Sequence, residues 1–314
     1  MLKQIFADVF RAHRKDRQHR GSRASSHSVE LSTPGNSFGQ LGHCWRVFGP
    51  RYDPSWPFDV AVVTPTVGRR SAVDAVASVF AQTGTLRIQL LIGVDAPKGS
   101  FTELIECLES GPPDVTTYLF YPGYSTSVRH GGLHPARDGG VLRTVLTYLA
   151  NARYVAYLDD DNWWAPNHLQ SLLAAIAGRT WAFSHRWFVH PVTRKVVCED
   201  SWESVGPGKG IFRERFGGWV DPSCLMFDKL SCEPAIRWWS IPLPGDEKAM
   251  SADRNVYDFL QRNGPPGEVS EPTVFYAMQS DDAIHPHRLS VMGELYEEAG
   301  GVVVPAYAFE NGQI

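Results

Sequence analysis

Three consecutive carboxylates stand in the middle of the chain, where their spacing suits the binding of a cation. Asp159, Asp160 and Asp161 come directly after an apolar run, residues 154–158, of the kind found in buried strands. Carboxylates this close repel one another, so the group needs a counter-charge. Mn²⁺ or Mg²⁺ fits, because these ions take one or two carboxylates and complete their shell with water and phosphate oxygens. The alternative is a solvated acidic turn that caps the helix predicted after it.

Polar residues also follow two other apolar runs, at positions where the strands of a parallel sheet would end. Thr64, Pro65 and Thr66 close the first run and are followed by Arg69, and Asp95 closes the second. In open α/β sheets, ligands bind beyond the carboxyl ends of the strands. These residues are therefore expected beside the three aspartates, although Asp95 could instead be an ordinary turn residue.

Two further charged residues stand on predicted helices. Arg143 lies in the apolar helix expected over residues 140–150, and Asp253 stands near the start of a helix expected over residues 251–260. The positive end of a helix keeps a carboxylate ionised, which a general base requires. The plainer interpretations are a surface ion pair for Arg143 and a helix N-cap for Asp253.

Alternating strands and helices must position these residues, and the sequence predicts them from residue 58 onward. Repeated βα units of this kind predict an α/β fold with a Rossmann-like, mostly parallel sheet and helices on both faces. The second half lacks the regular alternation, and a smaller mixed layer on the substrate side of the sheet is expected there. Strands are predicted at residues 59–63, 88–94, 115–121, 154–158, 180–188, 195–199 and 224–227, and helices at residues 71–80, 100–110, 140–150, 166–177 and 251–260.

Together these segments resemble the nucleotide-sugar half of the family 2 glycosyltransferases. The resemblance rests on the order and spacing of residues 64–69, Asp95, Arg143 with Thr144, and residues 154–162. It covers residues 58–178 well and residues 179–290 loosely. It implies the GT-A fold, and it implies transfer of a sugar from a nucleotide-diphosphate donor to an acceptor hydroxyl with inversion at the anomeric carbon.

The resemblance also implies how the donor is bound. Asp161, together with Asp159, would hold Mn²⁺ or Mg²⁺, which neutralises charge that builds on the leaving diphosphate. The family's Ala-Arg-Asn segment reads Leu142-Arg143-Thr144 here, a departure from the pattern. One set of residues would bind the donor nucleotide: Thr64, Pro65, Thr66, Arg69, Asp95, Arg143 and Asp160.

The second half must supply the group that takes the proton of the acceptor hydroxyl. The resemblance implies Asp253 for this role, because it matches an aspartate that precedes a hydrophobic helix in the family. The family's usual Glu-Asp pair reads Ala252-Asp253 here, so Asp246 or Glu247 stays open as an alternative base. Aromatic faces stack well on sugar rings, and acceptor contacts are expected from Trp163, Trp164, Asp221 and Ser223.

Charge is distributed unevenly along the chain. The 314 residues have a net charge of −4 at pH 7, yet the first 23 carry seven Lys or Arg and only two Asp. The acidic remainder argues against a nucleic-acid-binding protein, which needs clustered basic residues. The basic tail is interpreted as a disordered segment, a membrane-surface helix or a transit peptide. The second interpretation predicts a cytoplasmic enzyme at the inner face of a membrane, contacted through residues 1–23, near a glycan or lipid-linked acceptor.

The expected organisation has four parts. A tail and irregular lead-in occupy residues 1–57, the nucleotide-sugar-binding half residues 58–178, the acceptor-binding and catalytic half residues 179–290, and a C-terminal tail residues 291–314. No apolar run is long enough to span a bilayer. The five cysteines include no Cys-x-x-Cys pair, which fits a reducing compartment and no zinc site.

Two other functions stay open on sequence alone. A non-catalytic protein that binds a nucleotide sugar or a glycan could use the same fold. A sugar-1-phosphate nucleotidyltransferase would share the sheet and the metal, but it should carry a Gly-rich phosphate loop with basic residues. Residues 64–70 contain one glycine and no lysine, which disfavours the second possibility.

Overall fold

A computed structural model describes residues 45–50, 56–84, 86–95, 101–137, 139–245 and 252–300. Every described residue belongs to one compact unit, within Ser37–Ile314. The basic tail and the alternative bases Asp246 and Glu247 lie outside the described residues. None of the helices in the described ranges is long and apolar enough to cross a membrane.

Four parallel strands form the half of the main sheet that the sequence predicts most clearly. They are ordered β4, β3, β2, β5 across the sheet. Each is a nearly continuous apolar run, because both faces of a parallel sheet are covered. The antiparallel strand β1 (Trp45–Phe48) pairs with β4 at the edge. The four strands are β2 (Phe58–Thr66), β3 (Ile88–Val94), β4 (Val115–Phe120) and β5 (Ala152–Tyr157).

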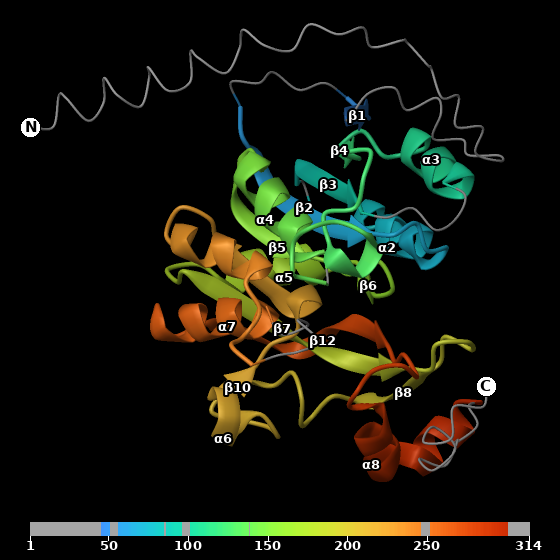
Figure 1. Ribbon diagram of the computed structural model, residues 1–314, viewed down its shortest axis with the longest axis vertical. Helices are drawn as coiled ribbons and strands as arrows, with labels where there is room; N and C mark the ends of the chain where they lie inside the picture. Colours follow the sequence, from blue (N-terminus) through green and yellow to red (C-terminus); the bar gives the residue numbers. More distant parts are fainter. Residues whose placement is uncertain are drawn as a thin grey trace, which may run out of the picture. The chain divides into compact units, whose positions relative to one another are not determined.

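Helices cover both faces of this parallel half (Figure 1). Helix α4 (Gly140–Leu149) lies against β2 and β3 on one side, where Leu142 and Leu146 pack closely on the backbone of Gly93. Helices α2 (Ser71–Phe80) and α3 (Thr102–Glu109) pack against each other on the opposite side. The apolar faces of α2 and α4 follow the helical spacing seen in the sequence.

The second half continues the same sheet with mixed strand directions. Beyond β5 the order is β11, β7, β12, β6, and only the pair β7 and β12 is parallel. Strand β8 (Val196–Glu199) pairs with β7, and a separate two-stranded sheet joins β9 (Gly206–Pro207) to β10 (Gly218–Trp219). The continuing strands are β11 (Leu225–Asp228), β7 (Trp181–Val189), β12 (Gly267–Ala277) and β6 (Trp163–Trp164).

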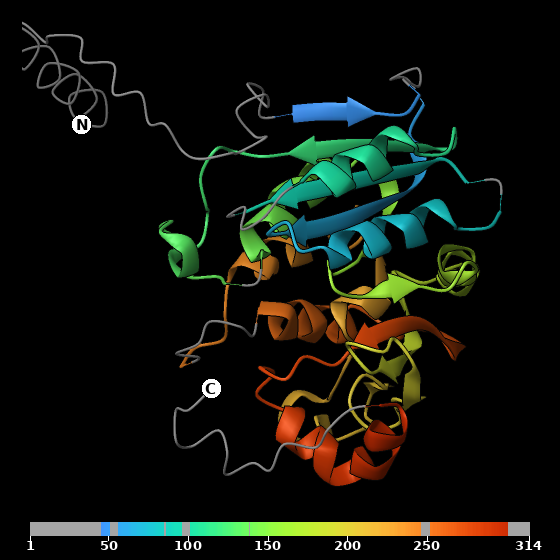
Figure 2. The ribbon, with the colours of Figure 1, turned by 90° about the vertical axis from the view of Figure 1, so that its right-hand side faces the viewer.

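Helices complete the second half (Figure 2), and α6, α7, α8, η3 and η4 contribute residues to the pocket described below, whereas α5 does not and η2 belongs to the first half. Helix α7 packs against η4, and η4 also contacts α4 of the first half. One apolar core runs through both halves and includes the fully buried Trp181 and Trp239. The helices are α5 (His168–Ala175), α6 (Arg213–Phe216), α7 (Ala252–Arg262) and α8 (His285–Glu298), with the 3-10 turns η2 (Val128–His130), η3 (Pro222–Cys224) and η4 (Glu233–Ser240).

The predicted α/β architecture is confirmed, with a parallel half, helices on both faces and a mixed layer beside it. Strand β12 and helix α8 were not predicted. Helix α8 runs across residue 290, where the predicted second half ends, and the division of the chain into functional halves stays a prediction.

Candidate active site

The carboxyl ends of β2, β3 and β5 bring the predicted donor-side residues together. The backbone N–H of Asp95 donates to the carbonyl of Thr66 at 2.9 Å, and that of Leu158 donates to the carbonyl of Val63 at 3.1 Å. The Thr66 hydroxyl then donates to Asp160 at 2.7 Å, across 94 residues of sequence. The structure therefore places the first and last of the predicted strand ends in direct contact.

Arg69 supplies the only arginine or lysine partner that the described residues give to Asp160 and Asp161. Its Nη1 lies 3.0 Å from Oδ1 of Asp160 and 2.8 Å from Oδ2 of Asp161. Burial, with added repulsion from Asp159 and Asp160, raises the pKa of Asp161 to about 8. Burial also raises the pKa of Asp160, against the pull of Arg69. Burial and mutual repulsion thus outweigh the attraction of Arg69 for these two carboxylates.

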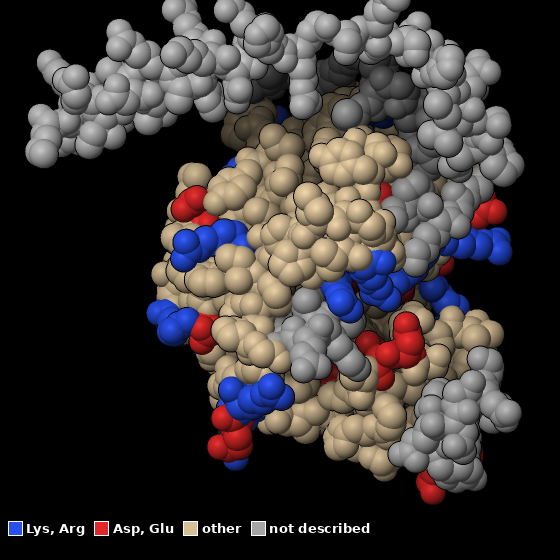
Figure 3. Space-filling view, viewed as in Figure 1, with Lys and Arg blue, Asp and Glu red and all other residues tan. Residues whose placement is uncertain are grey.

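Asp159 has a different partner and faces a large pocket. The guanidinium of Arg143, on α4, forms an ion pair with Asp159 and lies 5.4 Å from the ring centroid of Trp239. Arg143, Asp159 and Trp239 all line a pocket of about 930 Å³. On the face drawn in Figure 3, basic and acidic side chains lie side by side around a hollow in the surface. The arrangement gives the first aspartate and Arg143 access to a bound ligand.

The loop that carries the three aspartates is fixed from the other half of the sheet. The hydroxyl oxygen of Ser223 accepts hydrogen bonds from the N–H of Asp159 at 3.3 Å and from the side-chain amide of Asn162 at 3.0 Å. The indole N–H of Trp164 donates to the carbonyl of Ser223 at 2.8 Å. Ser223 and Trp164 are buried and do not line the pocket, so they act here as supports of the loop.

Trp163, the other tryptophan predicted to contact an acceptor, is covered on its ring faces. It stacks on Phe275 with an interplanar angle of 11°, and the guanidinium of Arg194 lies 3.5 Å from its ring centroid. Trp163 also does not line the pocket. Both tryptophans form strand β6, whose pairing with β12 places Phe275 opposite Trp163.

Asp95 is buried and holds the segment that follows β4. Its carboxylate accepts hydrogen bonds from the N–H of Thr126 at 2.8 Å and from the hydroxyl of Ser125 at 2.9 Å. Thr64 and Pro65 are buried nearby at the end of β2. Contact of these three residues with a nucleotide stays a prediction.

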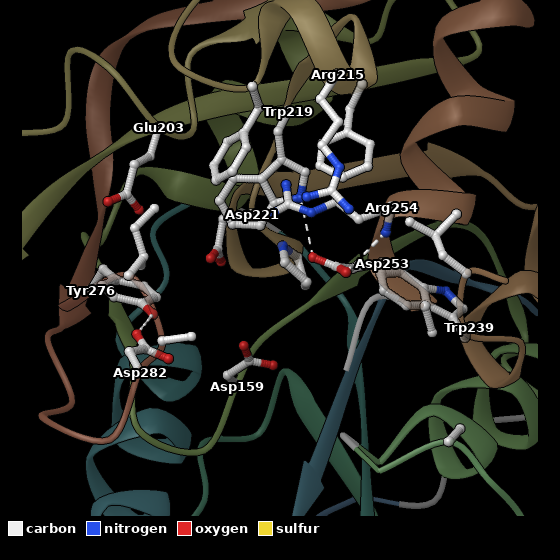
Figure 4. Close-up of a pocket in the computed structure, with 18 of the residues that line it drawn as sticks. Asp159, Glu203, Arg215, Trp219, Asp221, Trp239, Asp253, Arg254, Tyr276 and Asp282 are labelled. Carbon is white, nitrogen blue, oxygen red and sulfur yellow. Dashed lines mark hydrogen bonds between the residues drawn. The ribbon is translucent and has the colours of Figure 1, made fainter. Parts of the chain in front are cut away.

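Asp253, the predicted base, lies in the first turn of α7 and lines the pocket. Its Oδ2 accepts a hydrogen bond from the indole N–H of Trp219 at 3.1 Å, and its Oδ1 accepts one from the N–H of Arg254 at 2.9 Å. Figure 4 shows Asp253, Asp221 and Asp159 pointing toward the same cavity from different elements. The carboxylate predicted to act as base thus shares one pocket with the first aspartate of the triplet.

Asp221 lines the pocket from η3 and belongs to a buried ionic network. Arg186, on β7, donates to Asp221 at 2.7 Å, to Asp200 at 2.8 Å and to Glu203 at 2.7 Å. Arg288, on α8, donates two further hydrogen bonds to Glu203, at 2.8 and 2.9 Å. Burial raises the pKa of Asp221 to about 6, although Arg186 opposes this change. The network fixes the far wall of the pocket and joins α8 to it.

The sequence analysis did not predict several of the residues that line the pocket. Trp219 positions Asp253, and Arg254 and Arg215 add positive charge beside it. Only Arg254 had a usable signal, since it directly follows the predicted base. Trp219 and Arg215 stand in short, irregular elements whose pairing the sequence pattern does not predict.

The carboxylates at the strand ends have the chemistry of a hard-cation site. No group of three His, Cys, Asp or Glu side chains within the described residues is arranged to hold a metal. Mg²⁺ and Mn²⁺ sites that also use substrate phosphates need only one or two protein carboxylates. Asp160 and Asp161 are buried, and burial together with repulsion between the neighbouring aspartates raises the pKa of both. The residues present therefore fit such a cation.

Comparisons with known proteins find similarity in structure but not in sequence. No family model and no curated protein matches the chain. A fragment of S. aureus TarS in complex with UDP-GlcNAc matches with a TM-score of 0.51 and 12% identity, over 79% of this chain and 69% of that one. The same fragment in another crystal structure gives 0.50 and 11%, over 79% and 68%.

A mannosyltransferase from Pyrobaculum calidifontis, solved in complex with GDP-Man and Mn²⁺, matches with a TM-score of 0.47 and 12% identity, over 82% of this chain and 69% of that one. At such identities the likeness to TarS concerns the fold alone. It agrees with the topology described above, and the predicted α/β fold of GT-A type is confirmed.

Proposed function

We propose that this protein is a metal-dependent, inverting glycosyltransferase that moves a sugar from a nucleotide-diphosphate donor to an acceptor hydroxyl. The observation that carries the proposal is the shared pocket of Asp253, Asp159 and Arg143. In this pocket a carboxylate that can act as a general base faces the strand ends where α/β sheets bind ligands.

The donor would lie at the carboxyl ends of β2, β3 and β5. Thr64, Pro65, Thr66, Arg69, Asp95, Arg143 and Asp160 are proposed to surround its nucleotide. Asp159 and Asp161 would hold Mn²⁺ or Mg²⁺, which supplies positive charge to the leaving diphosphate when bound. Arg69 and Arg143 already pair with these aspartates, so both guanidinium groups stand where phosphate oxygens are expected.

Asp253 would take the proton from the acceptor hydroxyl as its oxygen attacks the anomeric carbon. Trp219 and the N–H of Arg254 hold the carboxylate in place through two hydrogen bonds. Attack from the face opposite the leaving group gives inversion in a single displacement. Asp221 lies in the same pocket on the acceptor side, with its oxygens held by Arg186 and by the N–H of Ser223.

The acceptor is proposed to be a glycan or a lipid-linked glycan. This part of the proposal includes peripheral membrane contact through the basic residues 1–23, because clustered Lys and Arg are attracted to anionic lipid. That segment lies outside the described residues.

Donor binding tests the proposal through stability. At a concentration of about 100 times its dissociation constant, a ligand stabilises the folded protein by about 2.7 kcal/mol. UDP-, GDP- and dTDP-sugars are screened by thermal unfolding with and without Mn²⁺. We expect one donor class to raise the melting temperature in an Mn²⁺-dependent way, and Asp161→Asn to abolish the dependence. Asp74→Asn, on the exposed face of α2, is the control. No stabilisation of the wild-type protein by any donor contradicts the proposal.

A further inference from the structure

The four arginines that line the pocket fall into two kinds. Arg143 forms an ion pair with Asp159, and Arg288 pairs with Glu203 and Asp282. Arg215 and Arg254 form no ion pair with any described residue, although both line the pocket. The positive charge of the first pair is neutralised within the protein, whereas that of the second pair is available to a ligand.

Arg254 is held rigidly in an aromatic cage. Its guanidinium lies 3.9 Å from the ring centroid of Trp219 and 4.2 Å from that of Phe212. Its Nη1 is buried and has no hydrogen-bond acceptor among the described residues. A buried guanidinium donor without an acceptor is costly, and an anion is the partner that best removes the cost. Burial also lowers the pKa of Arg254, although the charge of Asp253 opposes this change.

The acid beside Arg254 does not supply that counter-charge by contact. Asp253 uses its two oxygens to accept from the indole of Trp219 and from the backbone N–H of Arg254. The guanidinium of Arg254 instead lies over the rings of Trp219 and Phe212, and Figure 4 shows Arg254, Trp219 and Asp253 side by side in the pocket wall. Trp219 thus contacts both the proposed base, Asp253, and the guanidinium of Arg254.

We propose that the acceptor carries an anionic group, a phosphate or a carboxylate, which Arg254 and Arg215 bind beside Asp253. The inference rests on the proposed function and names the chemical class of its acceptor. Arginine suits both anions, because its planar guanidinium can donate two parallel hydrogen bonds to either. The aromatic rings of Phe212 and Phe216, which also line the pocket, provide apolar surface for a sugar ring that bears the anion.

The donor's diphosphate is the competing ligand for these arginines. It is assigned to the strand ends, where Arg143 and Asp159 line the pocket and Arg69 contacts Asp160 and Asp161 beside it. Arg254 stands on α7 next to the base, and Arg215 stands on α6. The proposal therefore predicts that the two arginines affect acceptor binding and leave nucleotide binding unchanged.

Three sugars that differ only in one substituent test the proposal by equilibrium binding to the full chain. Glucose 6-phosphate and glucuronic acid carry the two anions, and glucose is the neutral reference. We expect at least one anionic sugar to bind about 10-fold or more tightly than glucose, and Arg254→Gln and Arg215→Gln each to remove most of that preference. The anionic sugar that binds more tightly indicates whether the acceptor carries a phosphate or a carboxylate.

Arg213→Gln is the matched control, because Arg213 stands on the same short helix as Arg215 and pairs with Glu214 outside the pocket. Arg215 is exposed, so its replacement keeps the test valid if Arg254→Gln fails to fold. Equal binding of all three sugars, or a preference that survives both replacements, overturns the proposal.

Binding of UDP and GDP in the presence of Mn²⁺ is measured on the same samples. Weaker nucleotide binding in Arg254→Gln and Arg215→Gln assigns these residues to the donor and overturns the inference. If neither nucleotide binds the wild-type protein while the anionic preference depends on both arginines, the donor assignment fails and the anion site stands.

Discussion

At the scale of single residues, the indole of Trp219 connects the proposed chemistry to the pocket wall. Its N–H donates to Asp253 at 3.1 Å, while its ring lies against the guanidinium of Arg254. A charge-assisted hydrogen bond to a carboxylate fixes its orientation. Trp219 is therefore a positioning residue that acts through Asp253.

Replacing this indole with a phenyl ring isolates the hydrogen bond. Trp219→Phe keeps an aromatic face for Arg254 but removes the donor to Asp253. We expect kcat for sugar transfer to fall about 10-fold, with the donor KM unchanged, because a hydrogen bond to a charged group contributes about 1.5–3 kcal/mol. Steady-state kinetics measure both constants. Trp238→Phe, a partly exposed tryptophan outside the pocket, is the control. A change in donor KM alone would contradict the assigned role.

The sequence predicted the carboxylates of the site better than their partners. Asp159, Asp160 and Asp161 stood out because they directly follow an apolar strand, and Asp253 because it begins a helix. The pairing of Asp160 with Arg69 spans 91 residues of sequence, and that of Asp159 with Arg143 spans 16. No local sequence pattern predicts such contacts. Trp163 and Trp164 were predicted to contact an acceptor because they directly follow the aspartates and aromatic faces stack on sugars. In the structure Trp164 is buried, and Trp163 stacks on Phe275 of the paired strand.

At the scale of elements, the parallel half was predictable because its signals are local. The strand expected at residues 88–94 is observed as Ile88–Val94, and the helix expected at residues 71–80 as Ser71–Phe80. Both have unbroken apolar patterns at the spacing of their structure. The short turn that carries the aspartates follows directly from the end of β5.

The second half was less predictable because long-range polar contacts hold it together. Arg186, on the predicted strand β7, is fully buried and binds three carboxylates, Asp200 and Glu203 from one segment and Asp221 from another. Strand β12 contains Glu268, Glu271 and Pro272, and its register against β7 shifts twice around Pro272. Such a strand has neither clear alternation nor a continuous apolar run, so periodicity does not reveal it.

At the scale of the whole molecule, one buried histidine links stability to pH. His168 is fully buried, its ring stacks on Trp164, and its Nδ1 lies 2.7 Å from the Thr273 hydroxyl. Burial lowers its pKa from 6.5 to about 3. Below pH 6.5 the unfolded chain therefore binds a proton at this position that the folded protein does not. The free energy of unfolding should fall as the pH drops from about 6.5 toward 3.

The expected loss from His168 is about 2 kcal/mol between pH 7 and pH 5, since one pH unit corresponds to about 1.4 kcal/mol per proton. Urea unfolding at the two pH values measures it. In His168→Gln, which can still bond to Thr273, this part of the pH dependence should disappear. His287→Gln, at an exposed position, should keep it. An unchanged pH dependence in His168→Gln would show that the folded protein protonates His168 readily.

The central claim is that a nucleotide-sugar donor and the base Asp253 meet in one pocket. Its most direct test is the rate of nucleoside-diphosphate release from the donor that stabilises the protein, in the presence of Mn²⁺. Asp253→Asn should lower that rate about 100-fold or more, because a general base contributes about 10²–10⁴-fold. Its donor binding should match the wild type, and Asp258→Asn, one turn further along α7, should turn over normally. Equal rates for Asp253→Asn and the wild type, or no release by the wild type from any donor, would contradict the account.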